Sequence, residues 1–586
     1  MLSSLLIVCL IAELLQSYTL ILAVPFYICF VLASIVLVGL ILKYGNETMA
    51  VGALFSFSFV LRLIYYASTR FSVLPFGDPY AAYGTVLSTI QSSHVIVPTV
   101  SDYSFLPLDY MISYSQWPGF QLMSAQLAQI TGTNAFNVAM FLPLVLFAPL
   151  FIMSYALIKR LTNSIKDSLP KLPLLCLALV ICNPFFEIPP LFKYDFAAIL
   201  LIIPSILVLS YLLENWTTSG YFTVLLLSAG LTITHSYTSV LWVIFVSVLV
   251  IIGYTNRRFR FMAKILRGYL LERDQLTHTR MRNLLIVILI MSLAWWSFVG
   301  IEVWGAGRYL VEEVGIIYSI LMSSTGVSPF ASSGLTILTP GWILWILQIR
   351  NVVLLLLLVL GTIALFIIRS KDSAGGRLKL MLLVTAVVTV FATLSFYSGG
   401  NIGPYAYPSR ILAPLLGVIS VLPFVLLVRK RKTLARTLLV CVIGLLMFAA
   451  ALGFWGNSYA PVYLYNGQVS PSSFGEHPLI YSAVSHFTQY LSHPTCILTN
   501  EEFVTSLSIP FNYWPITHGL WSANANPGCI EIIYPSINAS SSYITEIPIG
   551  QSFNMSAYYE GMTNKSDLIL SASPEVQTNV QIYYVY

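Results

Sequence analysis

Charged residues are scarce in this sequence: Asp, Glu, Lys and Arg make up 9% of its 586 residues, whereas 57% are hydrophobic. Soluble domains carry about 25% charged residues, so these few charges cannot cover a water-soluble globule. This charge-poor, hydrophobic composition excludes a cytosolic enzyme, a disordered chain and a disulfide-stapled secreted module. The net charge of +6 is too dilute to indicate nucleic-acid binding. A polytopic helical membrane protein remains.

Several chemical motifs are absent as well. The sequence has no P-loop and no glycine-rich dinucleotide fingerprint, which argues against an ATP-driven pump. It also has no His-x-x-x-His, Cys-x-x-Cys or Asp-x-Asp cluster, so no metal-ligand spacing is evident.

Hydrophobic runs are abundant, and thirteen of them are long enough to cross a hydrocarbon core of about 30 Å. The first lacks a basic n-region and a small-residue cleavage site, so we interpret it as a helix and not as a signal sequence. The thirteen runs are approximately 2–22, 24–43, 49–68, 137–158, 173–188, 195–213, 220–235, 237–255, 284–302, 347–369, 378–397, 409–428 and 437–456.

The basic residues predict the orientation of these spans. Of the 29 Lys and Arg residues, 22 lie in alternate loops, at Lys43 and within 159–171, 257–282, 369–379 and 429–436. Cytoplasmic loops are enriched in Lys and Arg, so these loops and the N-terminus are predicted to be cytoplasmic. An odd number of spans then places the C-terminus outside. We therefore predict a multi-pass protein of the cell (plasma) membrane, with its spans in contact with the lipid bilayer.

The segment 457–586 has the character of an extracytoplasmic domain. It contains one basic residue, Lys565, against eight acids. Cys496 and Cys529 are the only cysteines outside the membrane part, and we predict that they form a disulfide. Three sequons predict glycosylation at Asn538, Asn554 and Asn564.

Two domains are therefore expected. Residues 1–456 form the transmembrane domain, with exterior loops at 69–136 and 303–346. In residues 457–586, short β-branched and aromatic runs at 496–499, 530–534 and 581–584 alternate with turn residues. This pattern predicts a small α/β or mostly β domain. Within the first exterior loop, helices are predicted near Pro79 and after Trp117-Pro118.

Few ionisable groups remain on the exterior face, and a reaction site must be drawn from them. Asp78 follows a span in Phe-Gly-Asp-Pro-Tyr; it suits either a site carboxylate or a helix N-cap before Pro79. Glu187 and Asp195 flank a short loop that also holds Lys193. A rim charge for Glu187 and a cap for Asp195 are the structural alternatives.

Arg410 and His235 complete the set of candidates. Arg410 opens a late span, where an arginine either extends to lipid headgroups or binds a phosphate through its planar fork. His235 lies at a turn between two spans, in Thr-Ile-Thr-His-Ser-Tyr. Neighbouring hydroxyl groups that satisfy a buried imidazole are one interpretation, and substrate contact is the other.

The order of these motifs resembles the GT-C superfamily of integral-membrane glycosyltransferases, which use polyprenyl-phosphate-linked sugars, and especially its uncharacterised prokaryotic and archaeal members. The resemblance spans roughly 49–430. The motifs that carry it are Gly77-Asp78-Pro79, Trp117-Pro118-Gly119-Phe120-Gln121-Leu122, Ile130-Thr131-Gly132, Asn183-Pro184-Phe185, Thr234-His235-Ser236 and Tyr407-Pro408-Ser409-Arg410.

The resemblance implies a GT-C-like fold and an inverting transfer of a sugar from a polyprenyl-phosphate-linked donor on the extracytoplasmic face. It also implies roles for residues. Asp78 corresponds to the catalytic base, Glu187 or Asp195 to a second acid, and Arg410 to the residue that contacts the donor phosphate. Lys193 would assist Arg410. A divalent cation (Mg or Mn) between Asp78 and Asp195 is compatible with this scheme, although nothing in the spacing requires one. The acceptor would be a lipid-linked glycan or a protein.

The sequence departs from the family pattern in three ways. The large exterior loop follows the third predicted span instead of the first. The paired Asp-Glu of protein mannosyltransferases and the Trp-Trp-Asp signature of oligosaccharyltransferases are both absent.

Two other functions are open at this level. A transporter or flippase would have inverted repeats and ionisable residues at mid-bilayer, whereas no repeat is evident here and the polar candidates gather at the exterior face. A surface-polymer ligase or polymerase shares the donor class, but it tends to place basic residues in its large exterior loop.

Overall fold

The computed structural model describes most of the helical part of the chain and four strands near its C-terminus. The described residues are 2–16, 47–68, 116–163, 171–181, 194–258, 275–300, 341–368, 373–395, 408–430, 496–498, 529–533, 566–572 and 580–585, with shorter stretches within 29–41, 82–95 and 433–446 and single residues at 165 and 192.

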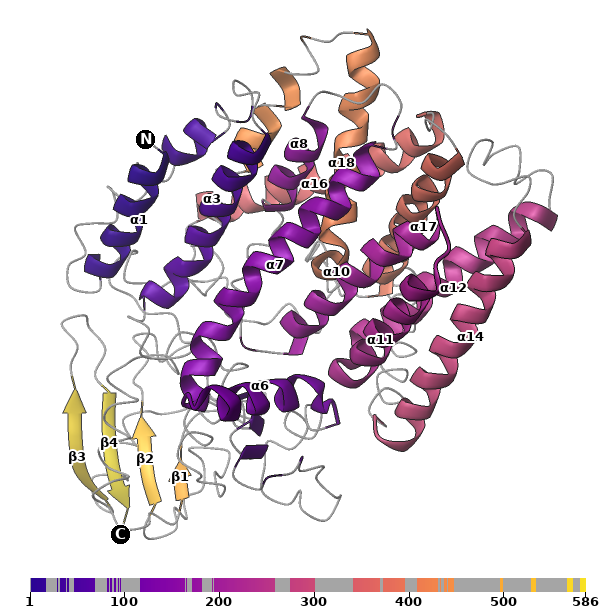
Figure 1. The fold of residues 1–586 in the computed structure, drawn as a ribbon. Coiled ribbons are helices and arrows are strands. Elements are labelled where there is room, and N and C mark those ends of the chain that lie inside the picture. The colour runs from indigo at the N-terminus through magenta and orange to yellow at the C-terminus, as the bar shows by residue number, and fades with distance from the viewer. Residues whose placement is uncertain are drawn as a thin grey trace, which may run out of the picture.

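Helices dominate the described part of the chain (Figure 1). With the exception of α6, each coincides with one of the predicted hydrophobic runs to within several residues at either end. The helices are α1 (Leu2–Gln16), α3 (Glu47–Ser68), α6 (Pro118–Thr131), α7 (Ala135–Asn163), α8 (Leu172–Ile181), α10 (Tyr194–Leu212), α11 (Thr218–Thr234), α12 (Ser236–Arg258), α14 (Gln275–Phe298), α16 (Gly341–Ile367), α17 (Ser373–Ser395) and α18 (Pro408–Lys430).

Length and composition identify the helices that suit a bilayer. Within the described residues, Ala135–Asn163 and Thr279–Phe298 are each long and apolar enough to cross a membrane, and eight further apolar helices are shorter. Large hydrophobic side chains on several of these helices are exposed, among them Val145, Leu226 and Ile290. An apolar outer face is what a lipid-facing helix requires. The number of spans and their orientation stay predictions.

The helix α6 is the one predicted after Trp117-Pro118, within the segment 69–136. Its ends are set by residues that favour the start and the end of a helix. Pro118 stands at the first helical position, where the missing N–H costs nothing. Gly132 ends the helix in the left-handed region, with φ of 64°, and its N–H bonds to the carbonyl of Gln129. The chain turns there into α7, whose first turn is capped by the Asn134 side chain, which accepts from the N–H of Phe136.

Hydrogen bonds between helices hold α11, α12 and α14 together. The indole N–H of Trp242 donates to the Ser228 hydroxyl at 2.8 Å, and that of Trp296 donates to the Ser239 hydroxyl at 3.3 Å. Interhelical hydrogen bonds of this kind stabilise helix packing in an apolar environment.

A four-stranded sheet lies toward the same end of the molecule as α6 (Figure 1). Its strands are β1 (Cys496–Leu498), β2 (Cys529–Ile533), β3 (Ser566–Ala572) and β4 (Val580–Val585), in the order β1-β2-β4-β3. The strands β1 and β2 are parallel and the other pairs are antiparallel. The three predicted β runs fall on β1, β2 and β4. The two-domain division and the extracytoplasmic location of this part stay predictions.

Candidate functional site

The predicted site residues differ in how far the structure describes them. Asp195 is the second residue of α10 and Arg410 is the third residue of α18; for both, only the backbone is described. His235 is described in full. The other predictions, at Asp78, Glu187, Lys193, Asn538, Asn554 and Asn564, lie outside the described residues.

The start of α6 packs tightly against the end of α11. A Cβ atom on Gly119 would lie 2.5 Å from the Thr234 hydroxyl and 3.1 Å from the carbonyl oxygen of Ile233. No side chain fits in this space, so glycine permits the contact. The Trp-Pro-Gly-Phe motif of the first exterior loop is thereby placed beside the Thr-His-Ser turn.

The same end of α6 also contacts α10. The ring of Phe120 lies 4.8 Å from that of Phe192 and 5.4 Å from that of Tyr194. The Tyr194 hydroxyl is 2.8 Å from the hydroxyl of Thr85, which belongs to the helical residues near Pro79 in the first exterior loop. Because Asp195 follows Tyr194, these contacts bring the start of α10 to the same end as α6 and the Thr-His-Ser turn.

His235 is the N-cap of α12. The backbone N–H of Thr238 donates to its Nδ1 at 3.3 Å, and the Thr238 hydroxyl lies 2.8 Å from the same atom. Since Nδ1 accepts, the proton of the neutral ring is on Nε2. The ring is 8% exposed. Thr238 thus satisfies Nδ1, and a contact between Nε2 and substrate stays a prediction.

Sequence reasoning missed two further polar residues, Gln121 and Ser124, which lie on the buried face of α6 and are 2% and 0% exposed. Among the described residues, Gln121 Nε2 and Ser124 Oγ have no hydrogen-bond partner. Polar residues at positions three apart on an amphipathic helix are ordinarily assigned to its solvent face, so no sequence signal distinguished them.

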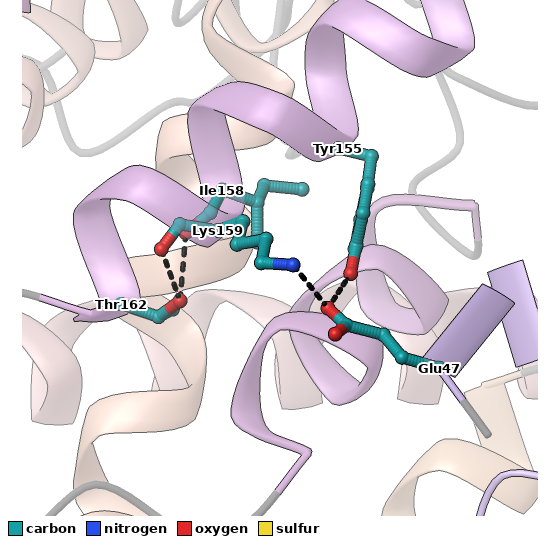
Figure 2. A network of polar contacts seen from close by, with 5 residues as sticks. All are labelled: Glu47, Tyr155, Ile158, Lys159 and Thr162. Carbon is teal, nitrogen blue, oxygen red and sulfur yellow. Dashed lines mark hydrogen bonds and ion pairs between the residues drawn. The ribbon is translucent and has the colours of Figure 1, made fainter.

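The opposite end of α7 carries a different network, which joins it to α3 (Figure 2). Glu47 accepts a hydrogen bond from the Tyr155 hydroxyl and lies 2.9 Å from Nζ of Lys159. The Thr162 hydroxyl donates to the carbonyls of Ile158 and Lys159 at 2.8 and 3.1 Å. The bond from Tyr155, followed by that from Lys159, lowers the pKa of Glu47 below its ordinary value.

Arg160 ties the same end of α7 to α10. Its Nε and Nη2 donate to the hydroxyl and carbonyl of Ser210 at 2.7 and 2.9 Å, and Nη2 lies 2.8 Å from Glu214. Lys159 and Arg160, two of the basic residues predicted to be cytoplasmic, thus lie at the end of α7 opposite to the Trp-Pro-Gly-Phe and Thr-His-Ser motifs. Helices that cross in alternating directions require such a separation.

Two arginines are buried within the helices. Arg62 is 1% exposed; its Nη1 donates to the carbonyl and hydroxyl of Ser58, both at 2.6 Å, and its guanidinium lies 4.5 Å from the ring centroid of Phe147. Arg350 is 2% exposed. A buried cation is costly unless polar or aromatic groups compensate its charge, as the Ser58 contacts and the Phe147 ring do for Arg62.

Metal ligands are not assembled in the described part of the chain, where no group of three His, Cys, Asp or Glu side chains is close enough to hold an ion. The divalent cation expected between Asp78 and Asp195 stays a prediction, because Asp78 and the side chain of Asp195 lie outside the described residues.

Comparisons with known proteins gave matches to solved structures alone: no family model and no curated protein matches the sequence. One match is an archaeal oligosaccharyltransferase, AglB from Archaeoglobus fulgidus, in complex with an inhibitory peptide and a dolichol-phosphate. It shares 10% identity over 81% of this chain and 66% of its own, with a TM-score of 0.47. The same enzyme with Zn and sulfate shares 13% identity over 81% of this chain and 63% of its own, with a TM-score of 0.45.

Another match is ArnT from Cupriavidus metallidurans bound to undecaprenyl phosphate, with 10% identity over 92% of this chain and 98% of its own and a TM-score of 0.41. These neighbours are membrane glycosyltransferases of the GT-C superfamily, which the sequence motifs resemble. The chain spans just under two thirds of the length of the oligosaccharyltransferase chains. With TM-scores below 0.5, this likeness carries no argument about activity, which has to rest on the residues and contacts of the chain itself.

Proposed function

We propose that this chain is a membrane glycosyltransferase that moves a sugar from a polyprenyl-phosphate-linked donor to a lipid-linked glycan or protein acceptor on the extracytoplasmic face. One observation carries the proposal: motifs that are distant in sequence meet at one end of the helical bundle. Gly119 of the Trp-Pro-Gly-Phe motif packs on Thr234, and Phe120 contacts Tyr194, which precedes Asp195. Nothing local in the sequence requires these contacts.

The reaction needs a base and a stabiliser of the leaving group. The oxygen of the acceptor hydroxyl attacks the anomeric carbon while the bond from that carbon to the phosphate oxygen breaks, and its electron pair leaves with the phosphate. Asp78 takes the hydroxyl proton. A single displacement of this kind inverts the anomeric centre. Arg410, with Lys193, stabilises the charge that develops on the phosphate.

The positions of Asp195 and Arg410 in their helices suit a second acid and a phosphate-binding residue, respectively. Each stands in the first turn of its helix, where backbone N–H groups point toward the helix end and favour negative charge. The first turn of α18 therefore adds N–H donors to the charge of Arg410 for binding a phosphate. The same field favours the ionised form of the Asp195 carboxylate.

The test is sugar transfer by the full chain reconstituted with a polyprenyl-phosphate sugar and a lipid acceptor. Asp78→Asn is expected to lower the transfer rate by about 10²–10⁴-fold, the range of general base catalysis. Asp102→Asn, in the same predicted loop, is the matched control and is expected to retain transfer. Full activity of the Asp78 variant would exclude it as the base. Movement of a solute across vesicles without any transfer would instead establish a transporter.

A further inference from the structure

Unpartnered polar atoms cluster on the buried face of α6. Gln121 Nε2 and Ser124 Oγ have no partner among the described residues, although their side chains are 2% and 0% exposed. Three residues apart, they lie one above the other on the same helix face. Burial without a hydrogen bond is unfavourable, and each such group in a folded protein calls for an explanation.

Several buried hydroxyls in these helices satisfy themselves by donating to a carbonyl four residues earlier. Ser205, Ser228 and Thr232 do so at 2.7, 2.7 and 2.9 Å. Ser124 does not. Its hydroxyl therefore stays available for a bond to a group from outside the helix.

A third unpartnered donor comes from α14. Trp295 Nε1 is buried and has no partner among the described residues. A Cβ atom on Gly300 would lie 2.7 Å from the indole of Trp117 and 3.3 Å from that of Trp295, so both indoles border Gly300. Trp117 is the N-cap of α6, four residues before Gln121. Through Gly300, the indole of Trp295 is therefore a neighbour of Trp117 at the start of α6, the helix that carries Gln121 and Ser124.

We propose that the Gln121–Ser124 face of α6 is a subsite that binds the hydroxyl groups of a sugar. This subsite rests on the glycosyltransferase function proposed above and supplies that function's contacts with the sugar. The Gln121 amide and the Trp295 indole donate to sugar oxygens, and the Ser124 hydroxyl both donates and accepts. Aromatic surface with a few placed polar groups is typical of small-molecule sites. None of these side chains is cationic, so the phosphate is bound elsewhere.

The experiment measures binding of defined probes to the full chain in lipid nanodiscs. The probes are undecaprenyl phosphate, its glucose, mannose and N-acetylglucosamine derivatives, and the corresponding methyl glycosides without lipid. The variants are Gln121→Leu and Ser124→Ala. The matched control is Ser154→Ala in α7, whose fully buried hydroxyl also has no partner in the described residues but lies next to Tyr155, at the opposite end of α7 from α6.

At least one sugar-bearing probe is expected to bind more tightly than its sugar-free counterpart. Each α6 variant should weaken that binding by about tenfold, the effect of one lost hydrogen bond in a buried site, and leave undecaprenyl phosphate unaffected. Ser154→Ala should change neither. Removal of an unpartnered polar atom should not lower the melting temperature of the ligand-free protein. A lowered melting temperature with unchanged sugar affinity would indicate a purely structural role and overturn the proposal.

The two proposals fail in different ways. If undecaprenyl phosphate and its derivatives do not bind but a methyl glycoside binds and is lost in the α6 variants, the polyprenyl donor is wrong and the sugar subsite stands. If lipid probes bind but sugars add nothing, or the variants bind sugar normally, the subsite is wrong. Separate KM values for donor and acceptor then assign the sugar: a raised donor KM places the donor sugar there, and a raised acceptor KM places the acceptor glycan there.

Discussion

Substitution of Gly119 by alanine tests whether the contact between α6 and α11 is as close as the structure shows. The added Cβ would lie 2.5 Å from the Thr234 hydroxyl, whereas real Cβ contacts essentially never fall under 3.0 Å. Either the Thr234 side chain or one of the two helices must therefore shift by at least about half an ångström. Overpacking of this kind costs about 1–3 kcal/mol, and the gain in helix propensity returns up to about 1 kcal/mol. A net loss between about zero and 3 kcal/mol follows.

Two further variants separate the clash from the general effect of the substitution. Gly52→Ala, in α3, has nothing within 4 Å of its new Cβ, so it should be neutral or stabilising. Thr234→Ala removes the hydroxyl that clashes, and its own cost is small because that hydroxyl bonds only to the Gly230 carbonyl within the same helix. The double variant with alanine at both Gly119 and Thr234 should therefore recover part of the loss.

The assay is reversible unfolding of the reconstituted protein in mixed micelles, with sugar transfer measured on the same samples. A coupling energy of about 1 kcal/mol between Gly119 and Thr234 is expected for residues in direct contact. Transfer should fall with the displacement of α6 and return in the double variant. If Gly119→Ala is no more destabilising than Gly52→Ala, or if the coupling is zero, the tight contact does not exist.

Two other predictions concern the sheet and the opposite end of α7. Cys496 and Cys529 are Cα partners in the parallel strands β1 and β2, which suits the predicted disulfide; it closes a loop of about 30 residues, so reduction or Cys529→Ser should cost about 3–4 kcal/mol. Cys441→Ser, at an exposed free cysteine, is the control. If alkylation without prior reduction labels both Cys496 and Cys529, the disulfide does not exist. Because the pKa of Glu47 is lowered from its ordinary value of 4.5, the ionised carboxylate stabilises the folded protein at pH values above 4.5. This stabilisation is lost as the pH falls through the pKa of the folded state. Unfolding of Glu47→Gln or Tyr155→Phe should depend less on pH below 4.5 than that of the unaltered chain, and identical profiles would contradict the network.

Much of the helical part was predictable because helices in an apolar environment consist of long runs of hydrophobic residues, which the sequence shows directly. Runs of hydrophobic residues long enough for a bilayer coincide with the described helices, and the Trp117-Pro118 start correctly predicted α6. Here the cause is local: hydrophobicity, proline and glycine act over a few residues, so a single pass along the chain detects them.

The candidate site was predictable only in part. His235 was recognised as a buried turn residue with neighbouring hydroxyls because its partner, Thr238, is three residues away. Gln121 and Ser124 were not recognised, since a polar pair on a helix has the same pattern whether it faces water or protein. Their significance depends on what packs against α6, which is set by residues more than a hundred positions later, such as Thr234 and Trp295.

The sequence alone determined that this chain is charge-poor and that its ionisable groups outside the basic loops are few. It also predicted a helical membrane protein and the positions of the described helices. Each of these follows from the cost of placing charge or unpaired backbone in hydrocarbon, which depends on residue type. Only the tertiary structure decided which of those segments meet. Two features depend on steric fit between helices that are distant in sequence: the contact of Gly119 with Thr234, and the burial of Gln121 and Ser124 without partners among the described residues. The amino-acid composition does not indicate such a fit.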